Sequence, residues 1–259
     1  MNIYPDGIPR SGRLAGRLAS AAVVAAGLAA MQAGPGVTAI GAVRRRFLPR
    51  LAGHGLADHV ALTFDDGPDP ETTPLFLEAL EAHGLHATFF MVGSCVRRSP
   101  ELAAKVAAAG HEIGVHGWEH RYLPLRGPRA TYRDLARARD VIAEATGTVP
   151  WLFRPPYGVL SSPAILAARR LELTCVLWTS WGREWTRGAT ADSVYTTLAT
   201  GLNGGATVLL HDSDHTSPPG SAMAALGALP LLLDECARTN LRVGPLSGHG
   251  SWWIRPAKC

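Results

Sequence analysis

Cysteines and charged side chains are both scarce in this sequence. Only four cysteines occur among the 259 residues, and no two of them are close in the chain: Cys95, Cys175, Cys236 and Cys259. This spacing excludes Cys-x-x-Cys redox motifs and zinc ribbons, which need neighbouring pairs. Charged residues make up 18% of the chain and hydrophobic residues 47%. A chain of this composition can bury a core, so intrinsic disorder is not expected.

A strict short repeat is absent as well. The 28 glycines and 19 prolines are scattered along the chain, which excludes collagen, coiled-coil and solenoid architectures. The formal net charge is only +4, and a charge this small does not by itself indicate a nucleic-acid partner. We therefore expect a globular protein that does not bind nucleic acid.

The first 57 residues differ from the rest of the chain and are predicted to form an N-terminal extension. Basic residues at positions 10, 13 and 17 precede an apolar segment over 18–40, which a Gly-Pro-Gly turn interrupts. This order is typical of a secretory signal, and the whole segment is long enough to anchor the chain in a membrane. A helix docked on the domain would have the same composition, so export, membrane anchoring and a cytoplasmic location all stay open.

A basic cluster over residues 44–50 follows this apolar segment. Arginines beside an apolar segment can contact anionic lipid or an acidic wall polymer. The extension therefore predicts association with a membrane or cell envelope as one alternative, and a solvated basic face as the other.

Strands and helices are predicted to alternate from residue 58 onward, with no linker between them. The predicted strands cover residues 60–64, 86–92, 112–115, 151–153, 173–178, 206–210 and 241–243. The predicted helices cover residues 73–83, 99–109, 132–145, 161–170, 193–202 and 222–237, with Thr73 as the N-cap of the first. Alternation of this kind indicates a parallel sheet covered by helices.

About seven strands fit one closed or nearly closed barrel better than two domains. We therefore predict a single catalytic domain of the α/β class over residues 58–249, followed by a C-terminal tail over 250–259. The strands of a parallel barrel all end on the same face, and barrel enzymes build their active sites there.

Polar residues follow several of the predicted strands. His116 and His120 are four residues apart, so on a helical turn they share a face and can bind one metal ion. One carboxylate would complete a two-histidine, one-aspartate site of the open, catalytic type. Asp65 and Asp66 are adjacent, so on an extended chain one can bind the metal while the other faces the substrate. His211, after another strand, can return a proton to a leaving group, and the whole set indicates metal-assisted hydrolysis.

Four segments resemble, in order and spacing, the motifs of the NodB-like polysaccharide deacetylases (carbohydrate esterase family 4). They are Thr63-Phe-Asp-Asp-Gly67, His116-Gly-Trp-Glu-His120, Arg154-Pro-Pro-Tyr-Gly158 and Leu209-Leu-His211. The resemblance implies a distorted, incomplete (β/α)7 barrel of the TIM type. It also implies a divalent metal, Zn²⁺ first and Co²⁺ or Ni²⁺ as alternatives.

The resemblance also implies a role for each matching residue. By the family's pattern, Asp65 is the general base, and the metal ligands are Asp66, His116 and His120. Arg154 orients Asp65, and the backbone N–H of Tyr157 helps to hold the oxyanion. Leu209 lines the pocket for the acetyl methyl group, and His211 is the general acid.

Two positions depart from the family's pattern. Gly117 stands where the family has a serine or threonine whose hydroxyl braces the loop. Trp181-Gly-Arg-Glu184-Trp185 stands where the family has Asp-x-x-Asp-Trp. We expect Glu184 to replace the aspartate that tethers Arg154. We also assign Trp181 and Trp185 to substrate binding, since aromatic rings cover the apolar faces of sugars, and we place Glu184 in the same substrate-binding set.

The predicted reaction is removal of N-acetyl, or O-acetyl, groups from a carbohydrate such as a chitin-like oligomer or peptidoglycan. One alternative uses the same scaffold as a deformylase or amidohydrolase on a lipid-linked sugar or a small cyclic amide. Another is a carbohydrate-binding protein without catalysis, which the altered fourth motif would fit. We expect a monomer.

Overall fold

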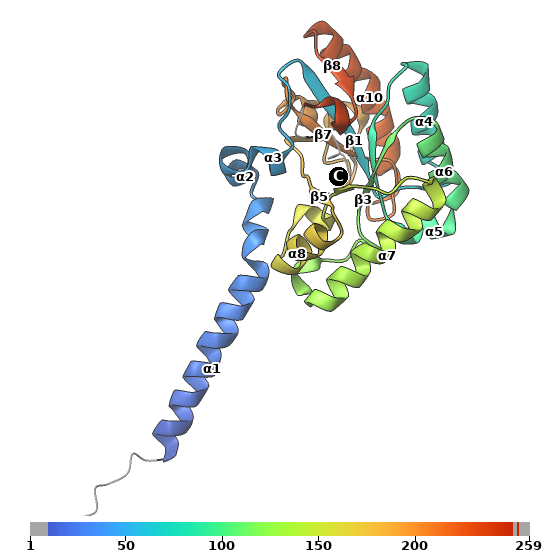
Figure 1. Ribbon diagram of the computed structural model, residues 1–259. Coiled ribbons are helices and arrows are strands. Elements are labelled where there is room, and N and C mark those ends of the chain that lie inside the picture. The colour runs from blue at the N-terminus through green and yellow to red at the C-terminus, as the bar shows by residue number, and fades with distance from the viewer. Residues whose placement is uncertain (1–9, 251–252, 254–259) are drawn as a thin grey trace, which may run out of the picture.

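The computed structural model describes residues 10–250 and 253, and a parallel sheet lies at the centre of this part of the chain (Figure 1). Its strands are β1 (His59–Asp65), β2 (Thr88–Met91), β3 (Glu112–Val115), β4 (Leu152–Phe153), β5 (Thr174–Cys175), β6 (Ser180–Trp181), β7 (Thr207–His211) and β8 (Arg242–Gly244). The order across the sheet is β5-β4-β3-β2-β1-β7-β6, and β8 pairs with β1. All these pairs are parallel. The curled sheet confirms the predicted α/β class and the distorted, incomplete (β/α)7 barrel.

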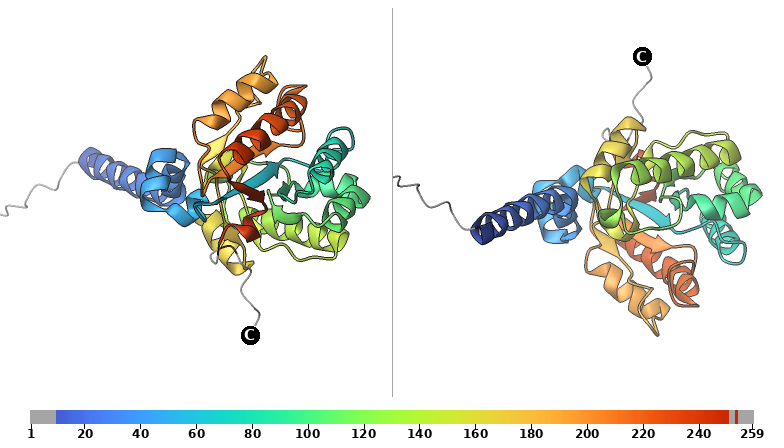
Figure 2. Two further views of the ribbon diagram at one scale, coloured as in Figure 1. Left: turned by 90° about the horizontal axis from the view of Figure 1, so that it is seen from above. Right: turned by 90° about the horizontal axis from the view of Figure 1, so that it is seen from below.

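Helices pack around the outside of the sheet (Figure 2). They are α4 (Thr73–Ala82), α5 (Gly93–Arg98), α6 (Pro100–Ala108), α7 (Pro128–Thr146), α8 (Ser162–Arg170), α9 (Ala191–Ala199) and α10 (Ser221–Arg238). The short 3-10 helices η2 (Leu123–Leu125), η3 (Pro156–Gly158) and η4 (Leu246–Gly248) lie in the connections. Every residue of β1 is buried, as expected for a parallel strand with both faces covered.

Two elements of the domain were not predicted from the sequence, and two helix starts were wrong: α7 begins at Pro128, four residues before its predicted start, and the N-cap of α4 is displaced by one residue. Strand β6 is only two residues long, and α5 directly precedes α6, so neither gives a separate hydrophobic pattern. Helix α4 takes Thr72 as its N-cap. Thr73 is the first residue of the helix, and its hydroxyl donates to Oδ2 of Asp212 at 2.5 Å.

The N-terminal extension consists of α1 (Arg10–Ala33), η1 (Gly34–Ala39), α2 (Gly41–Phe47) and α3 (Pro49–Ala52). Helix α1 projects away from the domain, whereas the elements after it pack against the barrel (Figure 1). They close the side between the end strands β5 and β6: Leu177, in the connection between those strands, donates its N–H to Leu51 O at 2.8 Å. The predicted boundary after residue 57 stays a prediction.

Arg44 gives this extension a polar attachment to the domain. The side chain is buried, and its Nε and Nη2 donate to the carbonyl oxygen of Trp178 at 3.2 and 2.8 Å. Its Nη1 donates to the carbonyl oxygens of Thr38 and Ala39. These bonds fix η1 and α2 on the barrel. Of the predicted tail 250–259, only residues 250 and 253 are described, and Trp253 is buried in the barrel.

Candidate functional site

The two aspartates after β1 have different surroundings. Asp65 is the last residue of β1 and lies level with His211, the last residue of β7. Asp66 follows with a positive φ of 80°, so the chain leaves the extended conformation between them. Both side chains are buried. The turn sends the Asp65 carboxylate toward Arg154 and the Asp66 carboxylate toward the two histidines, as the sequence predicted for adjacent residues.

Asp66, His116 and His120 form a compact group of potential metal ligands. Oδ1 of Asp66 lies 3.4 Å from Nε2 of His116 and 3.5 Å from Nε2 of His120. Within the described residues, these three are the group that brings three such donor atoms within 4.8 Å of one another. Two imidazoles and one carboxylate match the ligand set of open, catalytic zinc sites.

The protonation of His116 suits a metal ligand. Its Nδ1 lies 2.7 Å from the carbonyl oxygen of Arg154, which can only accept, so Nδ1 carries the proton and Nε2 has a free lone pair. Burial lowers the pKa of His116 to about 3, and the nearby His120 adds to this effect. Burial also lowers the pKa of His120. Both rings are therefore neutral near pH 7, as metal binding requires.

One atom shows that these residues fit a metal ion. Oδ1 of Asp66 is buried and has no hydrogen-bond partner, although it faces two imidazole nitrogens. A buried carboxylate oxygen without a partner costs free energy, and a cation among these three side chains would satisfy it. The other oxygen, Oδ2, accepts a short hydrogen bond from the Thr216 hydroxyl.

Arg154 is buried beneath Asp65 and holds its carboxylate. Its Nη1 donates to Oδ1 of Asp65 at 2.8 Å and also contacts Oγ1 of Thr63 at 2.7 Å. Its Nη2 donates to the carbonyl oxygen of Leu177 at 3.0 Å, and its guanidinium lies 4.1 Å from the ring centroid of Phe90. Burial raises the pKa of Asp65, while the Arg154 charge opposes that rise.

His211 is paired with Glu184 through the ring nitrogen that faces away from Asp66. Its Nδ1 lies 2.7 Å from Oε1 of Glu184, and its Nε2 lies 4.0 Å from Oδ2 of Asp66. Burial alone would lower the pKa of His211, but the Glu184 carboxylate outweighs it and the pKa rises to about 9. His211 therefore holds a proton at neutral pH, as a general acid must.

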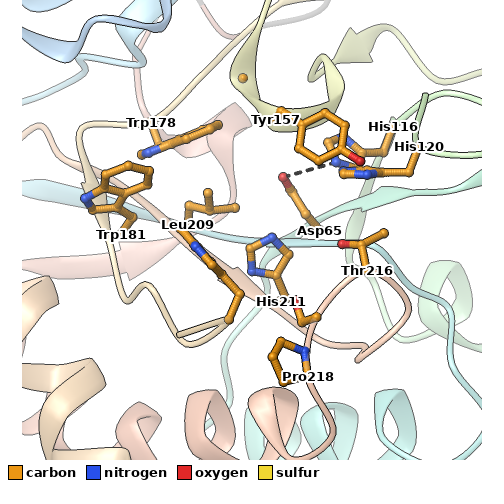
Figure 3. Close-up of a pocket in the computed structure, with 13 residues that line it drawn as sticks. Asp65, His116, His120, Tyr157, Trp178, Trp181, Leu209, His211, Thr216 and Pro218 are labelled. Atoms are coloured by element: carbon orange, nitrogen blue, oxygen red, sulfur yellow. Dashed lines mark ion pairs between the residues drawn. The ribbon is translucent and has the colours of Figure 1, made fainter. Parts of the chain in front are cut away.

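A pocket of about 270 Å³ opens above these groups. Its apolar wall contains Trp178, Trp181, Trp185 and Leu209, and the loop residues Thr216, Ser217 and Pro218 form another side. Figure 3 shows Trp178, Trp181 and Leu209 on one side and His116, His120 and Tyr157 on the other, with Asp65 and His211 between them. An apolar pocket with a few convergent polar groups is the usual form of a small-molecule site.

The structure brings the predicted residues to one site but changes two local expectations. His116 and His120 meet through an irregular loop rather than a helical turn, because Gly117 and His120 both adopt positive φ values. Glu184 is fully buried behind His211 and does not tether Arg154 or line the pocket. Trp178 is buried against Leu177 and Leu209 and also lines the pocket.

Two residues near the candidate metal ligands were missed in the sequence. Thr216 lies in the loop after β7, and the His-rich segment 211–215 before it was the only signal there. Asp134 lies on α7, and its Oδ2 accepts the backbone N–H of Trp118 at 2.8 Å. A Cβ on Gly117 would approach that same oxygen at 3.2 Å. Asp134 thus braces the loop in which the expected hydroxyl is absent.

The chain is similar to known proteins over most of its domain. Residues 53–176 match the family model described as polysaccharide deacetylase. A chitooligosaccharide deacetylase of Bradyrhizobium sp. (strain ANU 289) is 32% identical, over 72% of this chain and 88% of that protein. The peptidoglycan-N-acetylglucosamine deacetylase PgdA of Listeria monocytogenes is 33% identical over 71% of this chain. The match spans only 40% of the PgdA sequence.

A solved structure agrees with these sequence matches. The crystal structure of the Bc1960 peptidoglycan N-acetylglucosamine deacetylase, in complex with a hydroxamate-type benzamide, superposes with a TM-score of 0.71 and 26% sequence identity. The superposition covers 78% of this chain and 94% of that one. Together with the arrangement of Asp65, Asp66, His116 and His120 at the strand ends, these similarities show that the chain belongs to the polysaccharide deacetylase family.

Proposed function

We propose that this protein is a metal-dependent hydrolase that removes N-acetyl groups from a polysaccharide or oligosaccharide containing N-acetylglucosamine. The observation that carries the proposal is the position of Asp65 and His211. They end two neighbouring strands in register, on either side of the Asp66, His116 and His120 group. A base, an acid and an open metal site around one pocket are what hydrolysis of an amide needs. The relatives named above support N-acetylated sugars as the substrate class.

We assign the metal to Asp66, His116 and His120, and Zn²⁺ is our first choice of ion because two imidazoles and a carboxylate suit it. When bound, the ion supplies Lewis acidity that activates water and polarises the acetamide carbonyl. Oδ2 of Asp65 lies 3.6 Å from Nε2 of His116, beside the space where that water would be. Arg154 fixes the other oxygen of Asp65, so Asp65 is placed to take the proton from the water.

His211 acts on the other half of the reaction in this proposal. Glu184 holds its Nδ1, which leaves Nε2 facing the pocket with a proton. Nε2 donates that proton to the departing nitrogen as the bond between carbon and nitrogen breaks, so acetate and a free amino sugar are released. We assign the backbone N–H of Tyr157 to the oxyanion, and Leu209 and the tryptophan wall to the acetyl group and the sugar.

Incubation with N-acetylglucosamine oligomers tests the proposed function. The purified protein is loaded with Zn²⁺, Co²⁺ or Ni²⁺ after treatment with a chelator, and acetate is followed by proton NMR. Acetate release that depends on the metal is the expected result. Release of formate from formylated sugars, with none of acetate, would favour the deformylase alternative. Binding of the oligomers without release of either would favour a carbohydrate-binding protein.

A further inference from the structure

The segment 121–133, which runs from the loop after His120 into the start of α7, has an unusual surface that the proposed catalysis does not use. We name it the basic rim. It contains no acidic residue and four arginines: Arg121, Arg126, Arg129 and Arg133. Arg129 and Arg133 are exposed. Three of its large apolar side chains also face solvent, since Leu125 is 85% exposed, Tyr122 is 44% exposed and Tyr132 is 39% exposed. Arginines mixed with exposed leucine and tyrosine are typical of segments at a membrane surface.

Helix α1 is attached directly beside the basic rim. Nε2 of Gln32 donates to the carbonyl oxygen of Arg126 at 2.7 Å and to that of Pro124 at 3.3 Å. The hydroxyl of Ser162 donates to the carbonyl oxygen of Met31 at 2.6 Å. Leu125 therefore lies next to the point where α1 leaves the domain.

The described side chains of α1 that precede this point, residues 22–31, are apolar and exposed. The stretch Ala22–Ala39, which runs from α1 through η1, is long and apolar enough to cross a membrane, and only 6% of it is buried in the protein. Val23, Leu28 and Met31 are each more than half exposed. Figures 1 and 2 show this helix projecting away from the barrel. The bonds of Arg44 to Trp178, Thr38 and Ala39 fix the following segment on the domain, which sets the direction of α1 relative to the rim.

The basic rim also continues into the mouth of the pocket. The rings of Tyr122 and Tyr157 lie 6.0 Å apart, and Tyr157 contacts the ring of His120 at 4.5 Å between centroids. Tyr157 is itself 57% exposed and lines the pocket. One continuous surface thus runs from the end of α1, across the rim, to the proposed metal ligands.

We propose that the basic rim lies on the surface of an anionic lipid bilayer that α1 enters, so that the pocket opens at that surface. Arginines are attracted to anionic headgroups, and tyrosine and leucine side chains partition into the interface. An acidic wall polymer would match the charge alone and would leave Leu125 and α1 without a role. A pocket in this position serves sugar chains that are attached to, or lie close to, the membrane.

Hydrogen exchange of the full chain in lipid nanodiscs tests the proposal without any measurement of turnover. The protein is reconstituted in discs of phosphatidylcholine alone or mixed with phosphatidylglycerol. Residues 121–133 are expected to exchange more slowly in the anionic discs, while α9 on the far side of the pocket does not change. Each arginine near an anionic surface strengthens adsorption about fivefold. In the double variant R129Q/R133Q, the rim should therefore bind the anionic surface about 30-fold more weakly. Residues 121–133 of this variant should exchange as fast in anionic discs as in neutral discs.

A matched control removes the same charge from another part of the domain. R238Q/R242Q changes two exposed arginines near β8, far from α1 in Figure 1, and should keep the protection of 121–133. Equal exchange in both kinds of disc, or full protection in R129Q/R133Q, would overturn the proposal. Protection by a soluble polyanion as strong as that by anionic discs would overturn it in favour of an acidic polymer. Failure of deacetylation alone would leave this result unaffected, because lipid contact is read directly.

Discussion

The role expected for Asp65 depends on the residues that surround it, and not only on its being an aspartate. Asp66, the next residue, is just as buried but faces His116 and His120. Asp65 instead receives the Arg154 guanidinium on one oxygen, which leaves the other toward the pocket. The sequence could predict that adjacent aspartates diverge, and the family resemblance assigned their roles.

Replacement of Asp65 by asparagine is the sharpest test of the base. The variant keeps the shape but cannot accept a proton, so kcat should fall by about 10²- to 10⁴-fold. Bound metal per chain, measured by elemental analysis, should stay at the wild-type level because Asp65 lies outside the proposed ligand set. His116→Ala serves as the contrast and should lose both metal and turnover. A near-normal rate for Asp65→Asn would remove Asp65 from the base role.

Glu184 is the residue for which sequence reasoning reached the wrong partner. It was expected to hold Arg154, but Arg154 is held by Thr63, by Asp65 and by the Leu177 carbonyl oxygen. A backbone carbonyl cannot be recognised from residue types. The sequence therefore could not predict that the Leu177 carbonyl would hold Arg154 in place of an acidic side chain. Glu184 is instead free to face His211, since β6 and β7 are paired neighbours.

Glu184→Gln should therefore move the pH dependence of the reaction. Burial disfavours the imidazolium of His211, and the Glu184 carboxylate raises its pKa to about 9 in spite of that. Loss of the carboxylate lowers this pKa, so His211 loses its proton at lower pH and the alkaline limb of kcat shifts down. A fall of about two units would cost roughly tenfold in kcat near pH 8. The measurement is a kcat profile from pH 6 to about 10; an unmoved alkaline limb would contradict the role of Glu184.

At the scale of elements, the loop after β3 shows how the fold replaces a missing side chain. The family resemblance led us to expect a hydroxyl after His116, and Gly117 has none. Asp134 reaches this loop from α7 and accepts the Trp118 N–H. Residue spacing alone could not reveal this contact, because Asp134 and Trp118 are 16 residues apart and on different elements.

Asp134→Ala should loosen this loop and weaken metal binding. Trp118 would lose the acceptor for a buried N–H, at a cost of about 1–3 kcal/mol in the free energy of unfolding. Misplaced ligands should lower the affinity for Zn²⁺ by about 10- to 100-fold, measured by competition with a chromophoric chelator. Asp134→Asn keeps an acceptor and should lose less. Asp140→Ala, on the same helix with a side chain 74% exposed, should leave the affinity unchanged, and an equal loss in both alanine variants would contradict the bracing role.

At the scale of the whole molecule, strand and helix alternation predicted the barrel, but not how its open side and its base are closed. The open side is covered by α2 and α3, which contain the basic cluster 44–50 that the sequence assigned to an envelope contact or a solvated face. At the base of the barrel, where the strands begin, two histidines to which the sequence assigned no role contact each other. Nδ1 of His59, in β1, lies 2.8 Å from Nδ1 of His249. Nε2 of His249 donates to the carbonyl oxygens of Gly53 and Gly205.

This histidine pair gives the stability of the barrel a pH dependence of known sign. Both rings are buried; burial and then the neighbouring His59 lower the pKa of His249 to about 4, and burial lowers that of His59. In the unfolded chain His249 binds a proton near its ordinary pKa of about 6.5. The contribution of His249 to the stability of the folded barrel is therefore present above pH 6.5 or so and is lost as the pH falls toward 4.

His249→Gln should remove this part of the pH dependence. At pH 7.5 or so the variant should be less stable than the wild type, because the bonds to Gly53, Gly205 and His59 are lost or weakened. Near pH 5 the difference in the free energy of unfolding between the wild type and the variant should be about 2 kcal/mol smaller than at the higher pH. Urea denaturation with a chelator present measures it. His83→Gln makes the same change on an exposed side chain and should show no such convergence. A destabilisation by His249→Gln that is equal at both pH values would mean that His249 stabilises the barrel by packing alone.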